Sequence, residues 1–256
     1  MALKRQGKEL LADELAQKIK AKIENQEYQQ GQRLTVRRLC EEFGTSETPV
    51  KQALNQLVST GLIIAIPKCG MRVRTFDFKD LKNIWEARLM IEEYCAESAV
   101  ERARVDEEFV ANILRLLEVS NQEHSRCIEN FTHENFNCLN IHDEAIHMEI
   151  VKCCQNEQII SMYEGLNAHS GMFLGFNSQT PDTLREVMNQ HKRIVDALLL
   201  CDLDEVRKAL RQHIYTTIQV YRNAYFKQDV EKEKAKKIKA GKIKTNEPNR
   251  FSGSRP

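Results

Sequence analysis

The sequence lacks any long apolar segment. No run of apolar residues approaches the roughly 20 that a helix needs to cross a bilayer. The N-terminal stretch MALKRQGKEL has no apolar centre, and a secretory signal peptide requires one. We therefore expect no membrane span, no secretory leader and a cytoplasmic location.

Paired cysteines and a strong net charge are lacking too. The eight cysteines are scattered without a Cys-x-x-Cys pair, and the adjacent Cys153 and Cys154 are poorly placed to bridge to each other. This pattern indicates reduced thiols, as in the cytoplasm. The formal net charge is +1, so any surface for nucleic acid must be a local basic patch.

Helix-breaking residues are absent from a long stretch in the middle of the chain. No proline occurs between Pro67 and Pro181, and no glycine between Gly70 and Gly165. A stretch of this kind, rich in leucine, isoleucine, glutamate, alanine and lysine, predicts helices. We expect a mainly α protein of two domains and a tail. The predicted parts are a winged helix-turn-helix (1–76), an all-helical bundle (77–228) and a basic, disordered tail (229–256).

Residues 39–57, LCEEFGTSETPVKQALNQL, predict two helices joined by a tight turn. Gly44 is suited to end the first helix, because glycine adopts the left-handed cap conformation without steric cost. Thr45 and Ser46 offer hydroxyls to the first N–H groups of the second helix, and Pro49 fits its first turn. The pattern indicates a helix-turn-helix whose second helix suits the DNA major groove. An ordinary helical hairpin fits the same residues.

The next segment predicts a basic β-hairpin. Residues 62–66 are apolar and β-branched, 67–70 form a turn, and 71–74 alternate apolar with basic residues. A hairpin directly after a helix-turn-helix makes the winged variant of that motif. The basic residues near its tip, suited to phosphates or a minor groove, are Lys68, Arg72 and Arg74.

This pattern resembles the signature of the GntR family of bacterial transcription regulators over about the first 75 residues. The matching residues are Gly31, Leu34, Leu39, Gly44, Ser46, Pro49, Val50, Ala53, Leu54, Leu57, Gly61, Leu62 and Gly70. The resemblance implies double-stranded DNA as a partner. The residues that we expect at DNA are Arg37, Arg38, Thr45, Ser46, Glu47, Thr48, Lys51, Lys68, Gly70 and Arg72.

The chain departs from this family at two positions of the second helix. Glu47 and Lys51 stand where the family usually has arginine. Lysine keeps the charge but loses the bidentate fork that reads guanine or grips phosphate. Glu47 reverses the charge, although a carboxylate can accept from a cytosine amino group. Either the operator is unusual, or DNA binding is weakened and depends on Arg37, Arg38, Lys51 and the wing.

The C-terminal half predicts about six or seven helices up to Lys227, packed as a bundle. The expected helix starts are Asp77, Asp106, about Glu129, Asn156, Thr180 with Pro181, and Asp202. The last helix is expected to reach about Ala240, with disorder from 241 to 256. The basic tail is either solvated or adds nonspecific phosphate contacts.

Four residues of this half form a candidate metal site. Asp143 and His147 lie four apart on one helix and share a face, and His191 and His213 lie within two later helices. Three imidazoles and a carboxylate suit Zn²⁺, Ni²⁺, Fe²⁺ or Mn²⁺. For any one histidine taken alone, the pattern favours a solvent-facing or singly hydrogen-bonded residue over a metal ligand. The histidines outside this pattern, interpreted as structural, are His124, His133, His142 and His169.

This half resembles the FCD-type ligand-binding domain of the FadR subfamily of GntR regulators. The family's D-x-x-x-H motif matches Asp143 and His147, and its two later histidines match His191 and His213. Ile146 stands where the motif usually has phenylalanine. The resemblance implies that these four residues bind a divalent transition metal ion.

An effector site follows from the same resemblance. An octahedral ion with four protein ligands leaves two positions open, which suit a small carboxylate. Arg88 matches the arginine near the start of the domain and can pair with such a carboxylate; a structural salt bridge with Glu92 is the alternative. We expect a homodimer that binds a near-palindromic operator, with its affinity controlled by the effector.

Two other functions fit parts of the sequence. A metal with open positions in a helical bundle could serve a metal-dependent enzyme, but no nucleophile–base pair or phosphate loop is apparent, so we do not expect an enzyme. A regulator whose pocket holds no metal is the other alternative.

Overall fold

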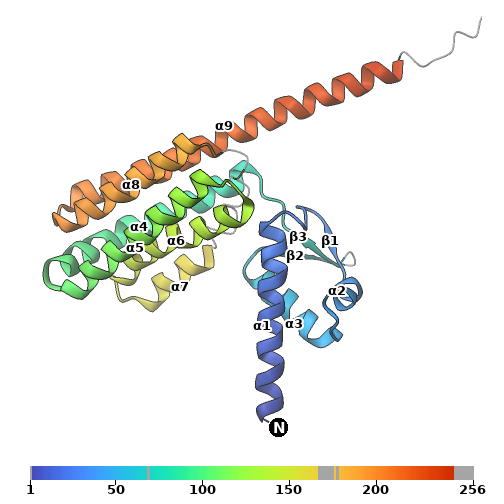
Figure 1. Cartoon of the computed structure of the whole chain (residues 1–256), viewed down its shortest axis with the longest axis horizontal. Helices are drawn as coiled ribbons and strands as arrows, with labels where there is room; N and C mark the ends of the chain where they lie inside the picture. Colours follow the sequence, from blue (N-terminus) through green and yellow to red (C-terminus); the bar gives the residue numbers. More distant parts are fainter. Residues whose placement is uncertain (1, 68–69, 167–175, 177–178, 245–256) are drawn as a thin grey trace, which may run out of the picture.

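The computed structural model describes residues 2–67, 70–166, 176 and 179–244. Lys68, His169 and residues 245–256 of the predicted tail lie outside this described part. Figure 1 shows a smaller N-terminal unit beside a helical bundle, with the end of the last helix running beyond the bundle.

The N-terminal unit holds three helices around an apolar core. Its helices are α1 (Ala2–Glu24), α2 (Val36–Phe43) and α3 (Glu47–Ser59). Thr35 caps α2 by accepting from the Arg38 N–H, and Gly44 ends it in the left-handed conformation, at φ 62°. Ser46 occupies the cap position of α3, but its hydroxyl makes no capping hydrogen bond. The helix-turn-helix prediction is therefore confirmed, and the capping role predicted for Ser46 is wrong.

A three-stranded antiparallel sheet completes this unit. Its strands β1 (Arg33–Leu34), β2 (Ile63–Ile66) and β3 (Gly70–Val73) lie in the order β1-β3-β2. The predicted hairpin is β2 paired with β3, with Ile63 opposite Val73. The two-residue strand β1 was not predicted, because it is too short to show an alternating pattern.

The C-terminal bundle contains six helices within the described residues. They are α4 (Phe78–Val105), α5 (Glu107–Glu129), α6 (His133–Lys152), α7 (Glu157–Leu166), α8 (Pro181–Leu199) and α9 (Leu203–Lys244). Helix α9 packs against α4 and α8, while α5 packs against α6 and α8. Trp85 of α4 meets Tyr221 of α9 edge-to-face in the core, with ring centroids 4.5 Å apart.

Most predicted helix starts are confirmed by their caps. Side-chain oxygens of the predicted cap residues accept from backbone N–H groups at Asp77, Asp106, Asn156, Thr180 and Asp202. The predicted start near Glu129 is wrong. Helix α5 continues through Glu129, and α6 begins at His133 because Thr132 accepts from the Asn135 N–H at 3.1 Å.

The last helix is longer than predicted. Helix α9 continues to Lys244, past the expected end near Ala240. Disorder was predicted from residue 241, so that prediction is wrong for residues 241–244, the end of a helical segment that runs through 229–244. Lysine, glutamate and alanine dominate this segment, and all three are good helix formers.

Among the described residues, hydrogen bonds connect the two units around Phe76 and between α6 and the end of α1, and the Phe76 N–H donates to Oε1 of Gln30 of the winged unit at 3.2 Å. Tyr225 of α9 donates to the backbone carbonyl of Phe76 at 2.7 Å, and the Asn137 amide of α6 donates to Asn25, just beyond α1, at 2.9 Å. Phe76 itself packs into the bundle core, so the predicted boundary at residue 76 stays a prediction. None of the described helices is long and apolar enough to cross a membrane.

Candidate functional site

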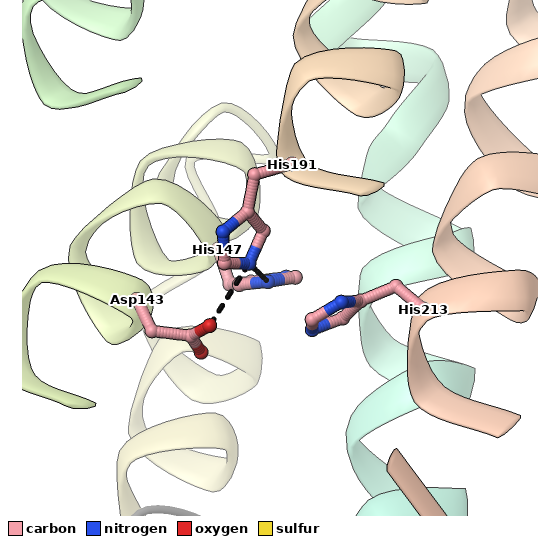
Figure 2. Close-up of side chains that lie close together, drawn as sticks. All are labelled: Asp143, His147, His191 and His213. Carbon is pink, nitrogen blue, oxygen red and sulfur yellow. Dashed lines mark hydrogen bonds and ion pairs between the residues drawn. The ribbon is translucent and has the colours of Figure 1, made fainter. Parts of the chain in front are cut away.

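The four predicted metal ligands converge inside the bundle. One potential ligand atom from each of Asp143, His147, His191 and His213 lies within 4.8 Å of all the others. Helix α6 supplies Asp143 and His147, α8 supplies His191 and α9 supplies His213, and Figure 2 shows their side chains facing a common point. All four side chains are buried. Three helices far apart in sequence thus assemble the predicted set.

The donor atoms of this cluster suit a cation. Nε2 of His191 lies 2.9 Å from Oδ1 of Asp143 and 3.3 Å from Nε2 of His147. A carboxylate oxygen and imidazole nitrogens at such spacing are the donor set that divalent transition metals accept in proteins. The residues present therefore fit the metal that the family resemblance implies.

Outer partners set the orientation of two of the rings. Nδ1 of His147 lies 2.9 Å from Oε2 of Glu92, and Nδ1 of His213 lies 3.2 Å from Oε1 of Gln190. Both partners accept, so each Nδ1 must carry the proton, and each Nε2 keeps a free lone pair. Metal-binding histidines commonly use their second nitrogen in this way.

Burial keeps the rings in the form that metals bind. It lowers the pKa of His147, and the nearby Arg88 lowers it further. Burial, followed by the neighbouring His191 and His147, lowers the pKa of His213 well below its usual value. Neutral imidazole is the metal ligand, so these two rings are ready to coordinate at neutral pH.

Arg88 lies in a buried charge network behind the cluster. Its Nε lies 2.5 Å from Oε1 of Glu92, and its Nη2 lies 3.7 Å from Oδ2 of Asp143. Tyr163 also donates to Glu92, at 2.7 Å. Burial opposes ionisation of Glu92, but Arg88 and His147 hold the pKa of its carboxyl well below the usual range. These contacts match the salt-bridge alternative for Arg88, and its binding of an effector stays a prediction.

A small cavity lies beside the cluster, lined by Asp143 and His213 together with other side chains. Its volume is about 30 Å³, enough for one or two waters. The amides of Asn140 and Gln179 and the hydroxyl-bearing Thr217 line it. The cavity therefore offers hydrogen-bonding groups next to the cluster.

Several residues of the site were missed from the sequence. Asn140 and Thr217 had a usable signal, since each lies one helical turn from a predicted ligand. Glu92 and Gln190 had none as orienting partners, because their roles depend on packing between helices. His124 was interpreted as structural; it lines the cavity, and its ring packs edge-on against His191 at a centroid distance of 5.9 Å.

The predicted DNA-contact residues of α2 and α3 lie at the surface. Arg37, Arg38, Ser46, Glu47, Thr48 and Lys51 are exposed, and Thr45 is partly buried. Glu47 forms an ion pair with Lys51 at 2.7 Å, and Arg37 forms one with Glu41 at 2.9 Å. The two departures from the family pattern thus neutralise each other on the exposed face of α3.

The wing contributes less free charge than predicted. Nη1 of Arg72 donates to the Gly31 carbonyl at 2.8 Å, and the side chain is half-buried. Gly70 is exposed, and Lys68 lies outside the described residues. Arg33, which pairs with Arg72 across the sheet, is exposed and was not predicted. A positive group at this edge therefore comes from β1 as well as from the hairpin.

Comparisons with known families match both halves of the chain. Residues 83–216 match the FCD domain family, and residues 11–73 match the family described as bacterial regulatory proteins, gntR family. In solved structures, the fold resembles that of McbR/YncC from Escherichia coli. The TM-score is 0.66 at 22% identity, over 84% of this chain and 98% of that one.

Curated relatives agree with these matches. The chain is 24% identical over 202 residues to the HTH-type transcriptional repressor GlaR of Escherichia coli K12, covering 77% of this chain and 89% of GlaR. It is also 24% identical over 200 residues to the HTH-type transcriptional regulator YdhC of Bacillus subtilis 168, covering 77% of this chain and 82% of YdhC. These relatives are transcriptional regulators, not enzymes.

Proposed function

Because the chain belongs to the GntR family of regulatory proteins and carries an FCD domain, we propose that a small ligand bound at a metal ion in this domain controls its affinity for DNA. The chain is a transcriptional regulator of the GntR/FCD type, and regulators of this family bind DNA. The metal, the ligand and the mode of control are our proposal.

The observation that carries this proposal is the convergence of Asp143, His147, His191 and His213 at one buried point. Burying a carboxylate among three imidazoles is costly unless the group is paired. A bound cation would compensate that cost, and the contacts of Glu92 and Gln190 already aim two rings at it. When bound, the ion would supply a Lewis-acidic attachment point for ligand oxygens.

Charge balance favours an anionic effector. Arg88 and Glu92 cancel each other. Histidines that bind a metal are neutral, so Asp143 would supply the one negative charge among the four ligands. A divalent cation would change this to one positive charge, which a monocarboxylate would neutralise. Since an unbalanced buried charge is expensive, a small carboxylate is the effector class that the site supports best.

The side chains around the cavity would orient this carboxylate. Asn140 and Thr217 offer hydrogen bonds, and the cavity of about 30 Å³ limits the ligand to a few atoms unless the walls move. Arg88 would act from behind Asp143 through its charge, and it would bind the carboxylate directly only if it left Glu92.

We further propose a homodimer that binds a near-palindromic operator. Met90 and Tyr94 lie one turn apart on α4 and are 63% and 64% exposed, which favours a protein partner on that face. A two-fold dimer would present two copies of α3 to two half-sites. Light scattering of the purified protein, which gives its mass in solution, tests the dimer.

Metal content tests the site. Protein purified without a His tag should carry about one metal equivalent more than His191→Ala. The matched control, Lys192→Ala, changes the exposed neighbouring residue and should keep the wild-type content. If the wild type and His191→Ala hold equal amounts of metal, the site does not bind it.

Thermal unfolding with a panel of small carboxylates tests the effector. A true effector should stabilise the metal-loaded protein by about 2.7 kcal/mol at a concentration 100 times its Kd, and should leave the metal-free protein unchanged. Equal stabilisation of both forms would favour the alternative of a metal-free pocket.

A further inference from the structure

A second cluster of metal-ligand side chains lies where α5 packs against α6. Glu123, Cys138 and His142 each offer one ligand atom within 4.8 Å of the other two. All three are half-buried, and none belongs to the Asp143 site. Of these three residues, the sequence pattern singled out only His142, which was interpreted as structural.

The two helices hold these side chains in position. Cys138 and His142 lie four apart on α6 and so share a face. Glu123 comes from α5, which packs along α6. Because all three residues lie on helices of a packed bundle, little ordering would be needed for them to bind an ion.

The environment of Glu123 also points to a missing cation. Its Oε2 is buried and receives no hydrogen bond of good geometry from the part of the chain that the structure describes, and the thiol of Cys138 is a near neighbour of the carboxylate. The Arg126 guanidinium lies 3.7 Å away, an ion pair too long for a hydrogen bond. A buried carboxylate oxygen with so little compensation is unfavourable, and a cation between Glu123, Cys138 and His142 would supply the missing partner.

We propose that Glu123, Cys138 and His142 form a second metal site, selective for a thiophilic divalent cation such as Zn²⁺. Thiolate, imidazole and carboxylate are the three donor types of zinc sites in proteins, and three protein ligands leave one position for water. The Asp143 site has only nitrogen and oxygen donors, so the sulfur ligand separates the two sites chemically.

Cobalt(II) is a suitable probe, because a cobalt–thiolate bond produces a charge-transfer absorption band in the near ultraviolet, whereas nitrogen and oxygen donors do not. We expect Co²⁺ added to the metal-free full-length protein to produce this band, which should reach its maximum once both sites are filled, by about two equivalents. The band should persist in His191→Ala, in which the first site is disabled. It should be lost in Cys138→Ser and kept in the control Cys127→Ser, which removes a buried α5 cysteine outside the cluster.

Two further variants test the other ligands without touching the thiol. Glu123→Gln and His142→Ala should each weaken Co²⁺ binding at the charge-transfer band by about tenfold or more, since even outer partners of a metal site contribute that much. No band in the wild type, or a band that survives in Cys138→Ser, would overturn the proposal. Binding that depends on Cys138 but not on Glu123 or His142 would overturn it too, because it would show a single adventitious thiol.

Discussion

At the residue scale, the buried carboxylate of Glu92 connects most of the groups around the metal cluster. It accepts from Arg88 at 2.5 Å, from Tyr163 at 2.7 Å and from His147 at 2.9 Å. It therefore balances the charge of Arg88 and fixes the tautomer of a predicted ligand at the same time. Stability and metal affinity should both depend on this one side chain.

We predict that Glu92→Gln destabilises the protein and weakens metal binding. The change removes the closest carboxylate partner of the buried Arg88, whose ion pair with Asp143 is longer, at 3.7 Å; breaking a buried ion pair costs about 3 to 5 kcal/mol. It also replaces the carboxylate that accepts from Nδ1 of His147 with a neutral amide. The weaker hydrogen bond orients the His147 ring less firmly, which should lower metal affinity about 10- to 100-fold. Urea denaturation and titration against a competing chelator measure the two effects.

Glu86→Gln is the matched control on the same helix. Glu86 forms an exposed ion pair with Lys82 at 2.7 Å, and such pairs contribute at most about 1 kcal/mol. The control should leave metal affinity unchanged. If Glu92→Gln were no more harmful than Glu86→Gln, Glu92 would not have the role that we assign to it.

The ion pair between Glu47 and Lys51 leads to a prediction about DNA. In Glu47→Gln, Lys51 loses its partner, and the surface of α3 loses a negative charge. Affinity for nonspecific duplex DNA should rise, and the dependence of log K on log salt should steepen by about one unit, as for one added phosphate contact. Fluorescence anisotropy at several salt concentrations measures both quantities.

Glu86→Gln is again a fair comparison, because it breaks an exposed lysine–glutamate pair of the same length outside the winged domain. Its DNA affinity and salt dependence should equal those of the wild type. Equal behaviour of the two variants would show that α3 does not approach phosphates through Lys51.

At the element scale, helix boundaries were predictable where a side chain caps the helix. Asp77, Asp106 and Thr180 were recognised from residue type and position, and each accepts the expected backbone hydrogen bond. The start of α6 was misplaced because the strong helix formers before Glu129 continue without proline or glycine into the cap at Thr132. A cap residue such as Asp106 is therefore easier to recognise from the sequence than a three-residue break without proline or glycine, as between α5 and α6.

The candidate site was predictable only in part, because a local sequence pattern does not show how separate helices pack against one another. Asp143 and His147 lie on one helix, so their spacing shows that they share a face. Their meeting with His191 and His213 was predicted from the family resemblance, because the packing of three helices cannot be derived from one helix pattern. The spacing of Arg88 and Glu92 indicates their salt bridge. The contacts of Glu92 with His147 and of Gln190 with His213 depend on that packing too, and no local signal indicates them.

Two glycines in different backbone conformations give a prediction at this scale. Gly44 ends α2 at φ 62°, and Gly165 lies within α7 at an ordinary helical φ; a methyl group would meet no atom within 4 Å at either position. Gly44→Ala should therefore cost about 1 kcal/mol through backbone strain alone. Gly165→Ala should raise stability by up to about 1 kcal/mol, because alanine favours helix over glycine. Chemical denaturation of both variants checks the opposite signs, and two losses of equal size would contradict the argument.

At the scale of the whole molecule, the two units have separate apolar cores. The core of the winged unit is centred on residues such as Ile19, Leu39 and Leu54, and that of the bundle on residues such as Trp85 and Ile194. Among the described residues, the two clusters share no member. The hydrogen bonds from Tyr225 to Phe76 and from Asn137 to Asn25 are contacts through which the bundle can influence the winged unit.

Separate cores predict that metal binding stabilises the two units unequally. All four ligands lie in the bundle, and a ligand stabilises the folded unit that binds it by RT ln(1 + [L]/Kd). Calorimetry of the metal-loaded protein should show two unfolding transitions. The transition of the bundle should shift to lower temperature when a chelator removes the metal, and the transition of the winged unit should stay nearly fixed. In His191→Ala, the shift of the bundle transition should shrink to what the Glu123, Cys138 and His142 site contributes, and in the double variant His191→Ala with Cys138→Ser the chelator should shift neither transition appreciably.

Any change in the unfolding temperature of the winged unit on metal removal measures the coupling between the two units. Regulation requires that the effector site and the DNA-binding unit exchange a coupling free energy, typically about 1 to 3 kcal/mol. Tyr225→Phe removes the hydrogen bond to Phe76 at the junction, so it should reduce the metal-dependent change in DNA affinity without changing metal content. If that change in DNA affinity is the same in Tyr225→Phe and in the wild type, coupling does not pass through α9 and the linker, and the contact between Asn137 and Asn25 becomes the next one to test.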